Sequence, residues 1–223
     1  MIKKLHYLSA IILVGFTMGH LLNHLMILHS EQAHLSFMEA FRKIYRFPPL
    51  EVLLYVSCII QTVTGILLLR KIWHLKNDIW HLLRVYSGIY LMFFITVHPL
   101  AILVGRYVWH MDTNLYFGAA TFNIAPIMYF FMVYYTVAVV SFFTHLACVH
   151  RTKMAAHSSL KAATRQAVAL IMVAVVIVFL IIYNMVGIKI PHEYFRKYEL
   201  YIKSSNVSFI LDFRRVDRGY IFF

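Results

Sequence analysis

The sequence predicts an all-α integral membrane protein, a bundle of five transmembrane helices. Hydrophobic residues make up 61% of the 223 residues, charged residues only 13%, and the mean hydropathy is +0.72. A soluble domain has about 25% charged residues. A membrane span needs about 20 mostly apolar residues. Five segments of this chain meet that requirement: 5–28, 49–70, 81–105, 124–149 and 165–187.

All five spans are expected to be α-helices, because lipid offers the backbone no other hydrogen-bond partners. The first apolar run is too long for the core of a signal peptide and lacks a small-residue cleavage site, so we expect it to remain as the first span. Pro48 and Pro49 open the second span and Pro126 opens the fourth, where the missing N–H of proline costs little. We expect one domain over 1–187 and a basic, aromatic tail over 188–223 that is interfacial or poorly ordered.

The formal net charge of +12 raises the question of nucleic acid, but the basic residues lie in short loops beside the spans and in the tail. There they set topology and attract anionic lipid headgroups, so we expect a lipid bilayer and no nucleic acid as partner. With the N-terminus inside, the inner segments carry ten basic residues and the outer loops four, which favours that orientation. The inner ten are Lys3, Lys4, Arg70, Lys71, Lys76, Arg84, Arg151, Lys153, Lys161 and Arg165; the outer four are Arg42, Lys43, Arg46 and Arg106. The tail lies outside in this arrangement and holds seven more, but late charges usually weigh less than those of early loops.

The two cysteines, Cys58 and Cys148, lie in separate apolar segments, and the chain has no CxxC or CxxCH motif. The sequence therefore predicts no disulfide framework, no zinc site and no covalently attached c-type haem.

Four of the thirteen histidines lie within apolar segments: His20, His24, His98 and His145. An imidazole in lipid is costly unless something binds it, so these positions are the first place to look for function. His20 and His98 both fall in the outer halves of spans that run outward, and Pro99 predicts a kink beside His98. Two imidazoles that face each other from two helices can hold a low-spin haem. The alternative for each is a hydrogen bond to a neighbouring helix, which we favour for His24.

His145 lies in the inner half of the fourth span, too deep to join that pair. His29 and His34 follow the first span, and we expect them to be solvated loop residues.

The local motifs resemble those of the five-span cytochrome b membrane-anchor subunit of succinate dehydrogenase and fumarate reductase. The first span reads Lys4-Leu5-His6 and then Gly19-His20-Leu21-Leu22-Asn23-His24; the third reads Arg84-x-x-Ser87-Gly88, ten residues before His98; and the fourth reads Ser141-Phe142-Phe143-Thr144-His145. The likeness covers about 1–150. It implies that the first four helices form a haem-binding core in an energy-transducing membrane, such as a bacterial inner membrane.

This resemblance implies that His20 and His98 bind the outer haem iron, and that His145 and a second-span residue bind an inner haem. The chain departs from the pattern at the second-span position, which is Gln61, a poor axial ligand for iron. We therefore expect one haem b and question the second. His145 is then a lone ligand, a partner of a quinone or propionate, or a structural hydrogen bonder.

Several outer residues are candidates for supporting roles. Arg42, Arg46 and Arg106 could pair with haem propionates, because arginine offers a fork of donors to a carboxylate, or they could contact lipid headgroups. Glu51 could accept protons from a quinol or cap the second span. The polar and aromatic run 106–117 could cover the haem edge.

The leading interpretation is a membrane b-type cytochrome that passes electrons between a haem and a quinone. It would anchor a peripheral dehydrogenase at a basic inner surface formed by loops 70–84 and 151–165. The alternatives are a haem-binding carrier, sensor or assembly factor without electron-transfer turnover, and a haem-free membrane scaffold.

Overall fold

A computed structural model of the chain describes residues 1–73, 78–125 and 127–204, and only the backbone over 199–204. Within those residues every regular element is helical. The elements are α1 (Ile2–Leu25), a short 3₁₀ turn η1 (Met26–Leu28), α2 (Glu31–Tyr45), α3 (Pro48–Ile72), α4 (Ile79–Leu103), a π-helical turn η2 (Val104–Val108), α5 (Leu115–Asn123), α6 (Ile127–Met154), α7 (Leu160–Met185) and α8 (His192–Ser204). The predicted all-α fold is confirmed.

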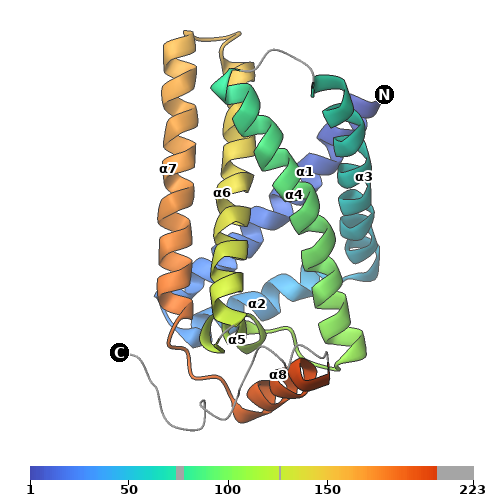
Figure 1. Cartoon of the computed structure of the whole chain (residues 1–223), viewed down its shortest axis with the longest axis vertical. Helices are drawn as coiled ribbons and strands as arrows, with labels where there is room; N and C mark the ends of the chain where they lie inside the picture. Colours follow the sequence, from blue (N-terminus) through green and yellow to red (C-terminus); the bar gives the residue numbers. More distant parts are fainter. Residues whose placement is uncertain (74–77, 126, 205–223) are drawn as a thin grey trace.

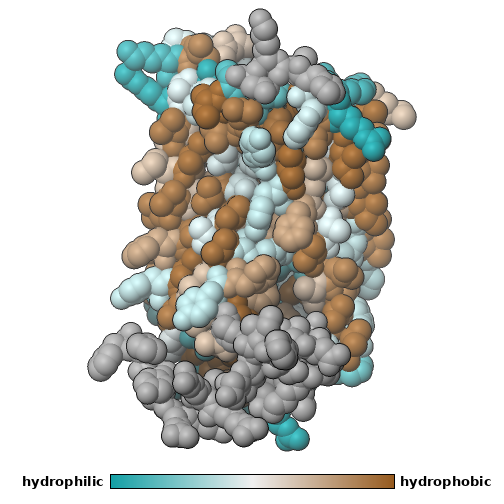
Figure 2. All heavy atoms as spheres, in the orientation of Figure 1, coloured by the Kyte–Doolittle hydropathy of each residue, from teal (hydrophilic) through white to brown (hydrophobic). Residues whose placement is uncertain are grey.

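Five of these helices, α1, α3, α4, α6 and α7, are long and apolar enough to cross a bilayer. Their ends lie within five residues of the predicted spans. Large apolar side chains point outward from them: Ile59, Phe130 and Phe179 are 62–65% exposed. Figure 2 shows apolar atoms along the sides of the bundle and hydrophilic atoms gathered toward its upper end. Such a surface suits contact with acyl chains, so the fold is consistent with an integral membrane protein.

Local signals explain where the helices begin. Pro48 and Pro49 occupy the first turn of α3, as predicted, with Glu51 in the same turn. The side chains of Ser30, Asp78, Asn114 and Ser159 each accept a hydrogen bond from a backbone N–H in the first turn of the helix that follows. Pro126 lies outside the described residues.

The bundle has two ends. We call the end where α1 begins the N-terminal end and the opposite one the far end; α2, α5 and α8 all lie at the far end (Figure 1). Helix α6 packs between α4 and α7. Its Ala147 and the α7 residues Ala163 and Ala167 are fully buried. Small residues allow such close approach. Helix α1 packs on α3 and crosses the bundle obliquely to reach α7 (Figure 1).

The far end contains helices that the sequence reading treated as loops. Helix α2 has an inner face formed by His34, Met38, Phe41 and Tyr45, which follow the helical period of 3.6 residues. Most of α5 is buried, and it packs on α6, α2 and α8. These helices close the far end over the membrane-crossing segments.

The part of the predicted tail that the structure describes forms α8. The Tyr194 hydroxyl accepts a hydrogen bond from Asn114 Nδ2 (2.7 Å), and the Tyr198 hydroxyl donates to the Phe117 carbonyl oxygen (2.8 Å). Burial raises the pKa of both tyrosines, so both hydroxyls stay protonated. Residues 205–223 lie outside the described residues.

Candidate functional site

A cluster of four histidines lies at the far end of the bundle. His20 and His24 come from α1, His34 from α2 and His98 from α4. The ring centres of His20 and His98 are 6.3 Å apart, with a 56° angle between the ring planes. His24 lies between His20 and His34. Its Nε2 is 3.3 Å from His20 Nε2, and its ring centre is 5.5 Å from that of His34. Of the predicted site residues, the structure thus brings His20, His24 and His98 together.

The His20 and His98 rings approach each other although their helices do not pack together. No Cα atom of α1 lies within 8 Å of a Cα atom of α4 in the described residues. Directly packed helices have axes about 8–10 Å apart. The two imidazoles therefore approach each other from helices that are not packed directly together.

Aromatic rings fix the orientation of both imidazoles. Phe16, one helical turn before His20, stacks on its ring at 5.8 Å and 12°. Phe94, one turn before His98, does the same at 4.9 Å and 9°. Residues four apart share a helix face, so these pairs follow directly from the sequence. Tyr135 of α6 meets the edge of the His98 ring at 5.9 Å.

The prediction that His34 is a solvated loop residue is wrong. His34 lies on the inner face of α2, is 2% exposed, and its Nε2 is 3.4 Å from Nδ2 of buried Asn23. Burial, together with the smaller effects of His20 and of the Arg42 charge, lowers the pKa of His34 to about 4. The imidazole is therefore neutral at physiological pH. The spacing of His34, Met38, Phe41 and Tyr45 was the signal that could have revealed this helix face.

A small cavity of about 60 Å³ adjoins the cluster, with room for several water molecules. Three buried polar atoms near it have no hydrogen-bond partner among the described residues: Asn23 Oδ1, His24 Nδ1 and His34 Nδ1. Buried polar groups normally have a partner, so these atoms mark a place for water or a ligand. The lining residues are His20, Asn23, His24, His34, Met38, Phe41, Tyr45, Thr113, Asn114, Leu115 and Gly118.

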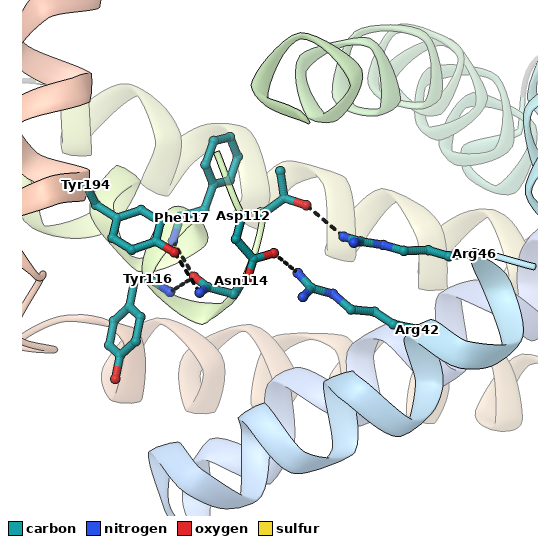
Figure 3. A network of polar contacts seen from close by, with 8 residues as sticks. Arg42, Arg46, Asp112, Asn114, Tyr116, Phe117 and Tyr194 are labelled. Carbon is teal, nitrogen blue, oxygen red and sulfur yellow. Dashed lines mark hydrogen bonds and ion pairs between the residues drawn. The ribbon is translucent and has the colours of Figure 1, made fainter. Parts of the chain in front are cut away.

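Charged side chains from α2 and from the residue that follows it reach across the far end to the segment before α5. Arg42 Nη2 lies 2.9 Å from the Asp112 carboxylate, and Arg46 Nη2 donates to Thr113 Oγ1 at 3.1 Å (Figure 3). The Nε atoms of both arginines are buried and have no partner among the described residues. These two predicted residues therefore keep donors available for an anionic group.

The other two predicted outer residues, Arg106 and Glu51, bind each other. The Arg106 guanidinium donates to the Glu51 carboxylate, and both side chains are largely buried. The run 106–117 contains the end of η2 and the start of α5 rather than a simple loop. It contributes Thr113, Asn114 and Leu115 to the cavity wall.

The remaining two predicted residues, His145 and Gln61, lie nearer the N-terminal end and bond to different partners. His145 Nδ1 is 3.1 Å from the Arg84 carbonyl oxygen and 3.3 Å from Ser87 Oγ. Gln61 bonds instead with two residues of α1: its Nε2 lies 3.1 Å from His6 Nε2, and its Oε1 accepts from Ser9 Oγ at 2.6 Å. His6 was not among the predicted site residues.

No group of three or more histidine, cysteine, aspartate or glutamate side chains in the described part of the chain is placed to hold a metal ion. A haem iron takes only two axial ligands from the protein, so a pair of histidines would suffice.

Comparisons with protein-family models, with curated proteins and with solved structures found no match to this chain. The likeness to the cytochrome b anchor subunits thus stays a prediction that depends on the sequence motifs.

Proposed function

We propose that this protein is a membrane-bound b-type cytochrome that passes single electrons between a haem and a quinone. The observation that carries the proposal is the His20–His98 pair. A metal–imidazole nitrogen bond is about 2 Å long. A ring nitrogen lies about 1.2 Å from the centre of its ring, given ordinary bond lengths. Two imidazoles that bind one iron from opposite sides therefore have ring centres about 6 Å apart, which fits the observed 6.3 Å.

The protonation of the neighbouring histidines is compatible with this role. The contact between His20 Nε2 and His24 Nε2 requires a proton on one of the two atoms. When His24 carries it, the lone pair of His20 Nε2 accepts that N–H, so the His24 ring would have to turn away for His20 Nε2 to bind iron. The bound haem would supply the one-electron chemistry, while the chain holds the iron and excludes water.

The surrounding residues would fix the position of the haem. Phe16 and Phe94 orient the two imidazoles by stacking. Arg42 and Arg46 have buried Nε donors without partners in the described residues, so they suit propionate carboxylates better than Arg106, which is paired with Glu51. The cavity of about 60 Å³ is far smaller than a porphyrin, so the proposal requires aromatic side chains at this end, such as Phe41, to move apart.

The charge distribution supports the rest of the proposal. Basic residues near the N-terminal end, among them Arg70, Arg151 and Lys161, favour placing that end inside and suit an acidic peripheral dehydrogenase. An energy-transducing membrane, such as a bacterial inner membrane, is the expected location.

A quinol-reduction experiment distinguishes this proposal from a haem carrier or sensor. The purified protein is loaded with ferric haem in lipid nanodiscs and mixed with a soluble quinol. We expect rapid reduction of the haem and a reversible midpoint potential near that of the quinone pool. Fast haem exchange without quinol reduction would instead identify a carrier, and failure to bind haem would leave only a scaffold.

A further inference from the structure

The far-end cavity presents both hydrogen-bond donors and acceptors to its contents. Asn23 Nδ2 can only donate, so the His34 Nε2 that it contacts at 3.4 Å accepts, and the proton of this neutral ring lies on Nδ1. That Nδ1–H has no partner among the described residues, although His34 is only 2% exposed. Asn23 Oδ1 has no partner there either, and it can only accept. A molecule that fills the cavity must therefore both accept and donate.

His24 adds a third polar atom of this kind. Its Nε2 contacts His20 Nε2, and its buried Nδ1 has no partner in the described part of the chain. The cavity measures about 60 Å³, which is room for several water molecules or for one small polar group.

Two arginines give this end of the bundle an excess of positive charge. The Arg42 side chain is 13% exposed and pairs with Asp112, whereas Arg46 forms no ion pair with any residue that the structure describes. The Nε–H groups of both arginines are buried and have no partner among those residues. Figure 3 shows both side chains running toward the segment before α5. Water can satisfy single polar atoms, but only an anion also compensates a buried charge, so the geometry favours an anionic group.

The arginines and the cavity meet at the start of α5. Thr113 accepts a hydrogen bond from Arg46 at 3.1 Å and forms part of the cavity wall, together with Asn114, Leu115 and Gly118. Helix α5 begins at Leu115, so the partial positive charge of its N-terminal end lies at the cavity. Phosphate groups bind well both at helix N-termini and to arginine.

The surface beside the arginines suits a lipid. Helix α2 connects the membrane-crossing helices α1 and α3, so it lies at the depth of the lipid headgroups. Ile44 and Phe47, on either side of Arg46, are 59% and 56% exposed, and Leu50 is 39% exposed. These apolar side chains can contact acyl chains while the neighbouring arginines contact a phosphate.

We infer that the far end binds one phospholipid, with its phosphate on Arg42 and Arg46 and a hydrogen-bonding headgroup in the cavity, as phosphatidylglycerol has. Glycerol hydroxyls both donate and accept, as Asn23 and His34 require. Choline has no N–H or O–H group, so phosphatidylcholine lacks the donor. The inference goes beyond the proposed cytochrome function and does not rest on it. An arginine has five N–H donors, so the same two arginines can also contact a haem propionate.

Lipid titration of the purified full-length protein in an uncharged detergent tests the inference, with the midpoint of thermal unfolding as the readout. We expect phosphatidylglycerol to raise the midpoint by about 5 °C at saturation, because a ligand that binds only the folded protein stabilises it. Phosphatidylcholine should need at least about ten times more lipid for the same shift. Equal titrations with the two lipids would overturn the inferred headgroup. An equal shift with inorganic phosphate alone would show that the site takes the free ion, and would overturn the lipid.

Two variants with matched controls test the position of the site. Arg46→Gln should weaken the binding of phosphatidylglycerol at least about tenfold, because it removes a charged donor. Lys43→Gln removes the same charge from an exposed position on α2 and should bind normally. Nothing lies within 4 Å of a Cβ atom on Gly118, so Gly118→Leu should fold, occupy the cavity and abolish the shift. Gly15→Leu, at an equally open position that does not line the cavity, should keep it.

Equal binding by Arg46→Gln and Lys43→Gln would overturn the role of the arginines. A full shift in Gly118→Leu would overturn the role of the cavity. The haem spectrum is a separate readout, so failure of the protein to bind haem would overturn the proposed function and leave the lipid result standing.

Discussion

Nδ2 of Asn23 lies 3.4 Å from Nε2 of His34, and this contact joins the end of α1 to the buried face of α2. Both side chains are at least 95% buried, and the chain between them is only ten residues long. The contact holds α2 against the far end, where it covers the histidine cluster.

Acid should destabilise the protein through His34. Its pKa is about 4 in the folded protein, against 6.5 in an unfolded chain. Between these two values the unfolded chain binds a proton that the folded protein does not, so stability falls as the pH drops from 6.5 to 4. Above pH 6.5 the effect vanishes. We expect a loss of about 2 kcal/mol over this window, allowing for some solvent screening.

Thermal unfolding in detergent at pH 7 and pH 4.5 measures this effect. His20, His24 and Arg42 also face His34, so the comparison is between variants that keep these neighbours. His34→Gln should flatten the pH dependence, while His29→Gln, at an exposed position, should not. Equal slopes for the two variants would show that His34 does not titrate in this way.

The Glu51–Arg106 ion pair should be more strongly coupled than the Arg42–Asp112 pair. The Glu51 and Arg106 side chains are 19% and 18% exposed, whereas Asp112 is 49% exposed. A double-mutant cycle with Glu51→Gln and Arg106→Gln should give a coupling energy of about 1–2 kcal/mol, against less than about 1 kcal/mol for Arg42→Gln and Asp112→Asn. Equal coupling energies would mean that burial of the first pair does not strengthen it.

Substitution of Gly88 should disturb His145. The Cβ of a Gly88→Val variant would lie 3.1 Å from His145 Cε1 and 3.3 Å from Nδ1. We expect a loss of about 1–3 kcal/mol in unfolding free energy, because the ring must leave the Arg84 carbonyl. Gly15→Val is the matched control, since nothing lies within 4 Å of a Cβ there. If both variants unfold at the same temperature, Gly88 does not hold the ring in place.

The membrane-crossing part of the fold was predictable because lipid leaves few choices to a long apolar segment. Helix α2 was missed because it is amphipathic: its polar face lowers the mean hydropathy, and only the spacing from His34 to Tyr45 shows its buried side. Helix α5 was missed because its nine residues are too few for a periodic pattern.

Part of the candidate site was likewise predictable from the sequence, and part was not. His20 and His98 were found because imidazoles within apolar spans are rare and their depths agree. The contacts of His6 with Gln61 and Thr64 join residues more than fifty positions apart, and no local pattern encodes them. The family resemblance implies that the residue at position 61 shares a haem with His145, whereas in the structure Gln61 lies beside His6.

The reduced-minus-oxidised absorption spectrum of the His98→Ala variant, measured beside the unmodified protein, tests the central claim most directly. We predict the sharp bands of low-spin b-type haem in the unmodified protein and loss of the component due to the far-end haem in His98→Ala and equally in His20→Ala. His24→Ala should keep that component. An unmodified protein without such bands, or a full spectrum in His98→Ala, would contradict the account.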